Sequence, residues 1–322
     1  MKTLDFIILL LFFVVVGLGI FLVFLVATPD LTVYEGRGAF VPNSEGKTPE
    51  ISRPFGAVEQ FYPNIRFPES EITYALDPAC DKKKEENILS AFSLLSSKTV
   101  LRFSPLLLGK EPRIRVLCSD IAPNSDERGH FVAGEGGPSE LINVSAFYVI
   151  LESKISLYRV DRCPEPKIAL HELLHALGFN HTSDPESIMY LVSSCTQQLD
   201  ESIVQEINRL YAIPSVPDLS LDAVSVNRIG GFLSFQANVS NRGFMPVISA
   251  NLSVYEQGTF LSSFTLADNG LPLGATKILT VKNLKVSKSS TEFEFVVEIY
   301  NPTQEIRIDN NRLGVSLEKN LR

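Results

Sequence analysis

The chain opens with a continuous apolar run. Residues 6–28 carry no charged side chain, and most of these 23 positions are Ile, Leu, Phe or Val. This length matches the roughly 20 apolar residues that a transmembrane helix requires. A cleaved signal peptide is the alternative, but its apolar core is typically about 7–15 residues long. We therefore predict a short cytoplasmic N-terminus over residues 1–5 and an uncleaved signal-anchor over residues 6–28.

Charges on either side of the apolar run predict its orientation. Lys2 and the α-amino group precede the run, whereas Asp30 and Glu35 follow it. Because positive charge favours the cytoplasmic side of a membrane, we expect residues 29–322 to be extracytoplasmic. The predicted location is the cell membrane, crossed once.

Glycine and proline interrupt the polar segment that follows, residues 29–61. No apolar period is sustained there, and this composition favours turns and loops over regular elements. We therefore predict a juxtamembrane stalk over residues 29–61. Its glycines and prolines are Gly36, Gly38, Pro42, Gly46, Pro49 and Pro54.

Residues 62–213 mix two apolar periods. Some segments alternate apolar and polar side chains as strands do, whereas others repeat apolar residues at helical spacing. Ile88, Phe92 and Leu95, for example, share one face of a helix. Strands are predicted over 72–76, 113–117 and 147–157, helices over 81–97, 167–177 and 202–211, and a glycine-rich segment over 129–138.

Helical periodicity disappears after the proline-containing linker at residues 213–217. Period-two alternation of apolar side chains then recurs, separated by Asn/Gly turns, and predicts an antiparallel β-sandwich within residues 214–322. The alternating apolar sets are Leu233, Phe235, Ala237 and Val239; Ile248, Ala250, Leu252 and Val254; and Phe293, Phe295, Val297 and Ile299.

Charge and cysteine content narrow the possible functions. The formal net charge is -8, which offers no basic surface for nucleic acid. The four cysteines are an even number in a compartment that permits disulfides, so two bridges with three possible connectivities are expected. Tetrahedral zinc on cysteines is the alternative, but no pair has the close C-x-x-C spacing of such sites.

The candidate chemistry is concentrated in residues 171–181. His171 and His175 lie one helical turn apart, so both imidazoles can bind one metal ion. Glu172 can reach a metal-bound water without being a ligand. Gly178 ends the helix and allows the chain to turn, which brings His181 back as a third ligand. Three nitrogen ligands with one open position are typical of catalytic zinc.

These residues resemble the metzincin signature H-E-x-x-H-x-x-G-x-x-H, and Met189 matches the methionine turn that follows it. Residues 181–185 and Met189-Tyr190 are most similar to matrixins, and the resemblance extends over residues 62–213. It implies an α+β fold, with a twisted sheet plus three helices, and one catalytic Zn²⁺. It also implies a zinc endopeptidase that hydrolyses protein or peptide substrates, with Glu172 as general base and Tyr190 as a possible oxyanion donor or packing residue.

Several family features have no counterpart here. The latency cysteine of a matrixin prodomain is absent, and Leu191 stands where a proline usually follows the Met-turn tyrosine. Structural zinc and calcium sites are not matched convincingly, so calcium binding is left open. His130 is interpreted as a structural or surface residue.

In a metzincin-like fold, the segments before the zinc helix and after the Met-turn flank one site. The resemblance therefore implies that Cys163 pairs with Cys195 and Cys80 with Cys118. The second bridge would join the start of the first helix to the end of a strand.

The C-terminal residues 214–322 resemble Ig-like CARDB adhesion modules, in their D-L start at Asp218-Leu219, their turn at Asn241-Arg242-Gly243 and their late Asp309-Asn310-Asn311. This resemblance implies a possible surface-protein or glycan ligand. Two alternative functions remain: an inactive metzincin scaffold, and a surface-adhesion protein that acts through the sandwich.

Overall fold

The computed structural model describes residues 30–36, 58–106, 111–124, 132–266, 270–300 and 304–317, with only the backbone described for 30–36. The chain forms two compact units. We call residues 39–217 with 242–245 the mixed unit, and residues 1–38, 218–241 and 246–322 the β unit. Among the described residues no helix is long and apolar enough to cross a bilayer; the predicted signal-anchor, residues 6–28, lies outside them.

The mixed unit is built on a largely parallel sheet. Its strand order is β2-β7-β5-β3-β4, and β6 pairs with β7 in the antiparallel direction. Among the described residues β6 pairs with no other strand, so one of its edges is open. The strands are β2 (Ile65–Arg66), β3 (Glu71–Leu76), β4 (Arg102–Pro105), β5 (Ile114–Cys118), β6 (Gly134–Val144) and β7 (Phe147–Leu157).

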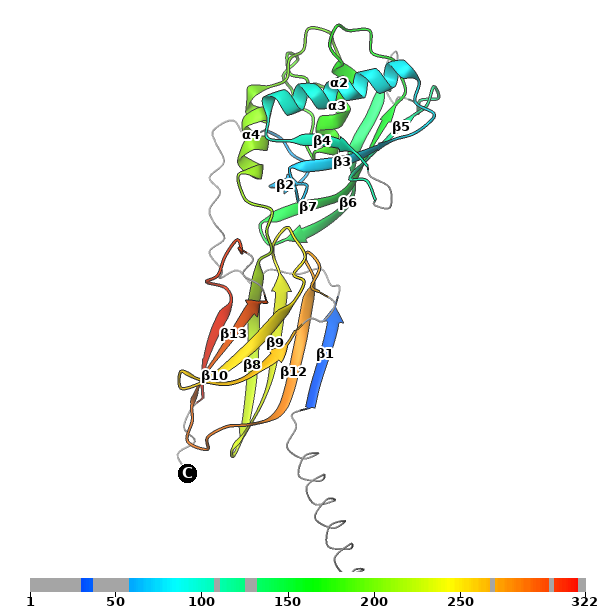
Figure 1. Cartoon of the computed structure of the whole chain (residues 1–322). Coiled ribbons are helices and arrows are strands. Elements are labelled where there is room, and N and C mark those ends of the chain that lie inside the picture. The colour runs from blue at the N-terminus through cyan, green and yellow to red at the C-terminus, as the bar shows by residue number, and fades with distance from the viewer. Residues whose placement is uncertain are drawn as a thin grey trace, which may run out of the picture. The chain divides into compact units, whose positions relative to one another are not determined.

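The described part of the mixed unit also contains three helices: α2 (Lys82–Lys98), α3 (Lys167–Ala176) and α4 (Glu201–Tyr211). Helix α3 lies along β6 and β7, α2 packs against α3 and β4, and α4 contacts β2 (Figure 1). The predicted apolar face of α2, formed by Ile88, Phe92 and Leu95, is buried in the core. The predicted sheet with three helices is therefore confirmed.

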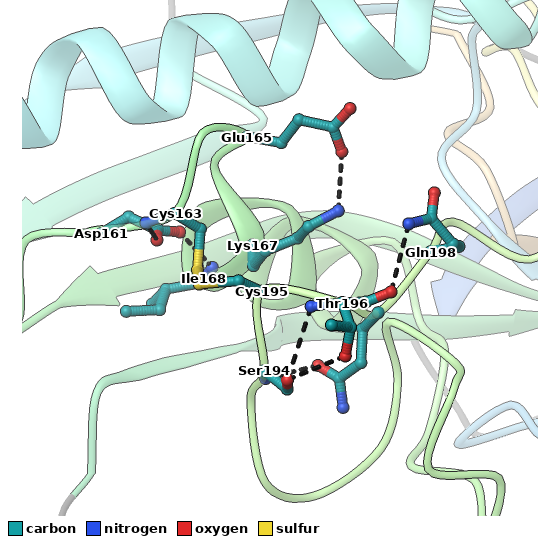
Figure 2. Close-up of a disulfide and its surroundings, with 10 residues drawn as sticks. Asp161, Cys163, Glu165, Lys167, Ile168, Ser194, Cys195, Thr196 and Gln198 are labelled. Carbon is teal, nitrogen blue, oxygen red and sulfur yellow. Dashed lines mark hydrogen bonds and ion pairs between the residues drawn. A yellow bond between two sulfur atoms is a disulfide. The ribbon is translucent and has the colours of Figure 1, made fainter.

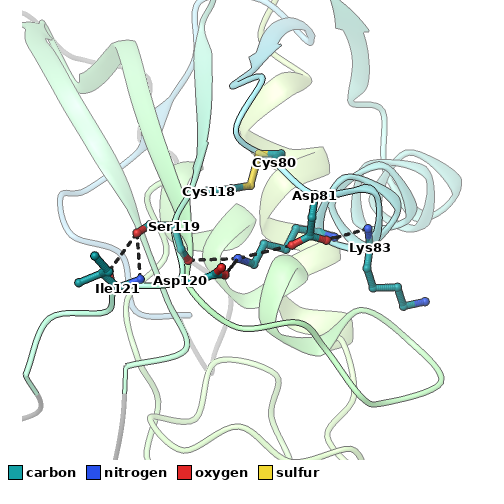
Figure 3. A network of polar contacts seen from close by, with 8 residues as sticks. Cys80, Asp81, Lys83, Cys118, Ser119, Asp120 and Ile121 are labelled. Carbon is teal, nitrogen blue, oxygen red and sulfur yellow. Dashed lines mark hydrogen bonds and ion pairs between the residues drawn. A yellow bond between two sulfur atoms is a disulfide. The ribbon is translucent and has the colours of Figure 1, made fainter.

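A disulfide and a buried lysine fix the start of α2. Cys80 is bonded to Cys118 at the end of β5, as predicted (Figure 3). Asp81 caps the helix by accepting from the backbone nitrogens of residues 83 and 84. The ammonium of Lys84, whose side chain is 3% exposed, lies 2.6 Å from Asp120. These contacts join the helix to the sheet independently of the core.

Arg66 ties the last helix to the sheet. It is buried, and its guanidinium lies 4.4 Å from the ring centre of Tyr211 and 4.3 Å from that of Phe244. It donates hydrogen bonds to the carbonyl oxygens of Leu210 and Ile213, beyond which the chain leaves α4. Burial lowers the pKa of Arg66 to about 10, so the group remains charged at neutral pH.

The described residues of the β unit form two four-stranded antiparallel sheets, β1-β12-β9-β8 and β11-β10-β13-β14. Apolar residues from both sheets form one core, which confirms the predicted antiparallel sandwich. The strands are β1 (Asp30–Gly36), β8 (Leu219–Ile229), β9 (Phe232–Asn241), β10 (Ala250–Glu256), β11 (Thr259–Thr265), β12 (Thr276–Lys285), β13 (Glu292–Ile299) and β14 (Arg312–Ser316).

The structure differs from the sequence predictions in two segments. Asp30–Gly36, assigned to the stalk, pairs with β12 along seven residues. Its Leu-Thr-Val-Tyr stretch has high β-propensity. The prediction treated residues 29–61 as one segment, and the glycines and prolines that follow this stretch indicated loops for the whole of it. The glycine-rich segment 129–138 is in part a strand, because β6 begins at Gly134.

Candidate metal centre

The helix that carries the candidate ligands, α3, is buried along most of its length, and its polar residues His171, Glu172 and His175 are buried with it. Ala169, Leu170, Leu173 and Leu174 are all buried, so the helix is stabilised by packing. Its N-cap residue gives no side-chain hydrogen bond. Instead Asp161, seven residues before Ile168, accepts the Ile168 backbone N–H at 2.7 Å. A carboxylate therefore stabilises the first turn from outside the helix.

Gly178 ends this helix and directs the chain toward the third histidine. Its φ of 97° is one that residues with a side chain rarely adopt. A Cβ at this position would also overlap the side chain of Ile65 in β2. Glycine is thus required here for backbone geometry and for space, and the turn places His181 against the helix.

The structure brings the three predicted ligands together. The Nε2 atom of His175 lies 3.0 Å from that of His171 and 3.1 Å from that of His181. The third side of this triangle, from His171 to His181, is 3.2 Å. Within the described residues, these three histidines form the group whose ligand atoms lie close enough together to hold one metal ion.

Backbone carbonyls orient two of the imidazoles. The Nδ1 atom of His171 lies 2.7 Å from the carbonyl oxygen of Ile188, and that of His175 lies 2.8 Å from the carbonyl oxygen of Phe179. A carbonyl only accepts hydrogen bonds, so each Nδ1 carries the proton. Each Nε2 then presents its lone pair to the centre of the triad.

Burial keeps the histidines neutral. Desolvation lowers the pKa of His171 and of His181, and lowers that of His175 to about 3 with a further contribution from neighbouring His171. A neutral imidazole is the form that binds a metal ion. The triad is therefore ready to bind a cation at neutral pH.

Glu172 lies beside the triad and is only 6% exposed. Burial, and secondarily the charge of Glu135, raises its pKa to about 8. Strand β6 covers this carboxylate closely because two of its residues lack side chains. A Cβ at Gly134 would lie 2.6 Å from the Cγ of Glu172, and one at Gly136 would overlap the Glu172 carbonyl oxygen.

The predicted Met-turn lies against the triad. Met189 is buried, and its carbonyl oxygen accepts the backbone N–H of Thr182 at 3.0 Å. The Ser187 hydroxyl accepts the backbone N–H of Met189 and donates to Asp200 at 2.7 Å. The turn is thus fixed at both ends. The half-buried Tyr190 follows it, and a part for its hydroxyl in the reaction stays a prediction.

The second predicted disulfide joins Cys163 to Cys195 (Figure 2). It links the segment before α3 to the segment after the Met-turn. Nearby, Lys167 at the start of α3 pairs with Glu165 at 2.6 Å (Figure 2). Both cysteines line a cleft of about 1440 Å³ together with the histidine triad. The bridge therefore lies at the wall of the candidate site.

Sequence reasoning missed several residues around the site. Gly134 and Gly136 were noted only as part of a glycine-rich segment, although two glycines two positions apart on a strand leave one face of it bare. Asp161 and Glu135 belong to no sequence motif that would have indicated a place at the site. His130 lies outside the described residues.

Comparisons with known proteins agree with this geometry. The matrixin family model matches residues 158–212, which include the triad, Glu172 and Met189. No curated protein gives a significant match. The predicted resemblance to matrixins is confirmed for this region, and the match and the triad support a zinc metalloprotease in general.

Three of the solved structures similar to this chain illustrate its two parts. Two are a crystal structure, in complex with di-metal ions, and a solution structure of the CARDB domain of one Pyrococcus furiosus protein. They are 22% and 20% identical, cover 32% of this chain and 90% and 94% of theirs, and each has a TM-score of 0.27. The third is high choriolytic enzyme 1, a hatching-enzyme zinc protease from Oryzias latipes, 16% identical over 45% of this chain and 90% of that chain, with a TM-score of 0.32.

Proposed function

We propose that this chain is a membrane-anchored, extracytoplasmic zinc endopeptidase of the metzincin type that uses Glu172 as general base. The observation that carries the proposal is the convergence of three neutral Nε2 atoms beside a buried carboxylate. Proteins or peptides are the substrates that we infer for the cleft.

The donor set fits zinc. Three lone pairs that face one another at 3.0–3.2 Å repel unless a cation lies among them. Zinc–nitrogen bonds of about 2.0–2.1 Å in tetrahedral geometry separate two ligands by about 3.3–3.4 Å. The spacing of the triad is close to this value, and a set of three histidines leaves one position open.

Glu172 is suited to moving a proton. When bound, zinc supplies a Lewis acid that acidifies water and polarises a carbonyl. The carboxylate of Glu172 takes a proton from the attacking water and returns it to the leaving amine. Burial raises the pKa of Glu172 to about 8 and excludes competing solvent, and the positive charge of a bound zinc ion would favour the ionised form that accepts the proton. The carbonyls of Ile188 and Phe179 meanwhile hold the imidazoles in place.

The open edge of β6 is suited to a substrate backbone. A peptide that pairs with this edge as an added strand lies beside the triad, because Gly134 and Gly136 of β6 lie against Glu172. Backbone pairing holds any sequence, so it positions the scissile bond without selecting it. Side chains in the cleft then determine which peptides are cleaved.

A metal assay combined with a digest tests the proposed function. The full chain, purified in detergent, is expected to contain one zinc ion per chain and to cleave casein, and a chelator is expected to stop cleavage until zinc is restored. Zinc binding without cleavage of any protein would favour the inactive-scaffold alternative. Absence of zinc binding would refute the proposed site.

The membrane anchor is a separate part of the proposal, and the apolar run at residues 6–28 supports it. Protease added outside intact cells is expected to degrade residues 29–322 and to spare the N-terminus. The protein is also expected to stay with membranes in a carbonate wash. A soluble product that begins near Thr28 would instead support a cleaved signal peptide.

A further inference from the structure

An acidic side chain outside the metal centre lines the same cleft. Glu135 lies on β6 between Gly134 and Gly136, whose missing side chains would point at α3. Because side chains alternate across a strand, Glu135 projects from the other face, opposite Ser156 of β7. It is exposed, and the cleft lining includes it together with the three histidines.

A single hydrogen bond fixes this carboxylate. The hydroxyl of Tyr158, which follows β7, donates to Oε2 of Glu135 at 2.6 Å. The bond leaves the other carboxylate oxygen available to a ligand. Tyr158 also lines the cleft. The carboxylate is thus held on the face of β6 that points away from α3, on a strand whose other edge could take a substrate strand.

Among the residues that the structure describes, no cationic side chain forms an ion pair with Glu135. Lys154 projects from the same face of β7, two residues from Ser156, but no ion pair joins it to Glu135 within the described residues. The same charge contributes to the raised pKa of Glu172, which agrees with a carboxylate close to the reacting centre. A cationic group in the cleft would therefore meet a carboxylate that accepts one hydrogen bond from Tyr158 and, within the described residues, has no ion-pair partner.

We propose that Glu135 makes the enzyme select peptides with Lys or Arg at the substrate position that faces it, with Tyr158 as the residue that positions its carboxylate. This inference rests on the proposed peptidase function. A peptide added to the edge of β6 turns every second side chain toward the face that carries Glu135. Opposite charges in neighbouring strands attract and like charges repel. Basic side chains are favoured and acidic ones disfavoured at that position.

The test measures how the full chain, purified in detergent, cleaves a series of fluorescence-quenched peptides. In each peptide one position carries Lys, Gln or Glu, and the other positions are kept constant. The wild-type kcat/KM is expected to be roughly fivefold or more higher for peptides with Lys than for peptides with Glu at one or two positions. Attraction of Lys and repulsion of Glu by an exposed carboxylate each change kcat/KM by about two- to fivefold, and the two effects multiply. The preference is expected to shrink as salt is raised.

Variants of the carboxylate then assign the preference. Glu135→Gln is expected to remove most of it, and Glu135→Lys is expected to reverse it in favour of Glu peptides. Tyr158→Phe keeps the ring but frees the carboxylate, so an intermediate preference is expected. Glu140→Gln is the matched control, because Glu140 is exposed on the same strand but does not line the cleft. It is expected to leave the preference unchanged.

The outcomes separate this inference from the proposed function. If wild type cleaves none of the peptides or casein, the peptidase itself is refuted. If wild type cleaves them without charge preference, or Glu135→Gln keeps the preference, selection by Glu135 is refuted and the peptidase stands. Equal loss of activity on all peptides in Glu135→Gln would also overturn the inference, since it indicates a part in the reaction itself.

Discussion

The two units bury polar side chains in opposite ways. In the β unit, polar groups at strand ends hold the chain: Asn241, which is fully buried, donates from Nδ2 to the carbonyl oxygen of Leu271 at 3.0 Å. In the mixed unit, His171, Glu172 and His175 lie in the middle of a buried helix and direct their acceptor atoms at one another or into the cleft. Polar groups that face other acceptors cost stability unless a ligand pairs with them.

The comparison shows what the packing of each unit stabilises. The β unit packs apolar side chains from two sheets into one core. The mixed unit uses its apolar helix, its two disulfides and the buried Arg66 to hold acceptors in an arrangement that is unfavourable without a cation. Damage to the centre and damage to the sandwich should therefore have separate effects. Two changes test this separation, and two further comparisons test contacts within the mixed unit.

The largest effect is expected on the catalytic rate, from a change that removes the base and leaves the three metal ligands intact. Glu172→Ala removes the base but no ligand, so kcat is expected to fall by about 10²–10⁴-fold or more while zinc content stays at the wild-type level. Casein cleavage and metal analysis of the purified protein measure both. Glu298→Ala, an exposed change in the β unit, is the control and is expected to have no effect. Near wild-type cleavage by Glu172→Ala would refute the assignment.

The converse change damages the sandwich. Phe295 is fully buried between the sheets, with its ring centre 5.0 Å from that of Phe235. Phe295→Ala is expected to destabilise the β unit by about 3–5 kcal/mol and to leave zinc affinity unchanged. Thermal unfolding followed together with zinc retention distinguishes the two. Loss of zinc at the temperature where only the β unit melts would show that the units are not independent.

The sequence predicted most of the site because its residues are close together in the chain. His171, Glu172 and His175 lie within two helical turns, and Gly178 and His181 follow directly, so helical geometry alone brought them together. Strands β9, β10 and β13 of the β unit were also predictable, since period-two alternation indicates which face of a strand is buried.

What could not be predicted arises from contacts between distant segments. β1 pairs with β12, about 250 residues later, and no local pattern indicates this partner. The close approach of Gly136 to Glu172 depends on how β6 and α3 pack, and the capping of α3 by Asp161 depends on a loop. Such contacts are fixed by tertiary structure rather than by periodicity.

The two disulfides offer a comparison within the mixed unit. Their sequence separations are 38 and 32, so the chain-entropy model gives each about 3–4 kcal/mol of stabilisation. Cys163→Ser/Cys195→Ser removes the bridge at the cleft wall and is expected to lower zinc affinity as well as stability. Cys80→Ser/Cys118→Ser is expected to lower stability alone. Competition with a zinc chelator measures the affinity, and equal affinities in the two variants would contradict this distinction.

The smallest effect is expected from one methyl group placed at the contact between β6 and α3. A Cβ at Gly136 would overlap the carbonyl oxygen of Glu172, which is backbone and cannot rotate away, so strand and helix must move apart. Gly136→Ala is expected to cost about 1–3 kcal/mol of stability and to lower kcat by displacing the base. Gly137→Ala is the matched control, because a Cβ there meets nothing within 4 Å. Denaturant unfolding and peptide kinetics on both variants provide the measurement. If Gly136→Ala matched Gly137→Ala in stability and rate, the close packing of β6 on Glu172 would have no part in holding the base, and the glycines of this strand would serve only the backbone.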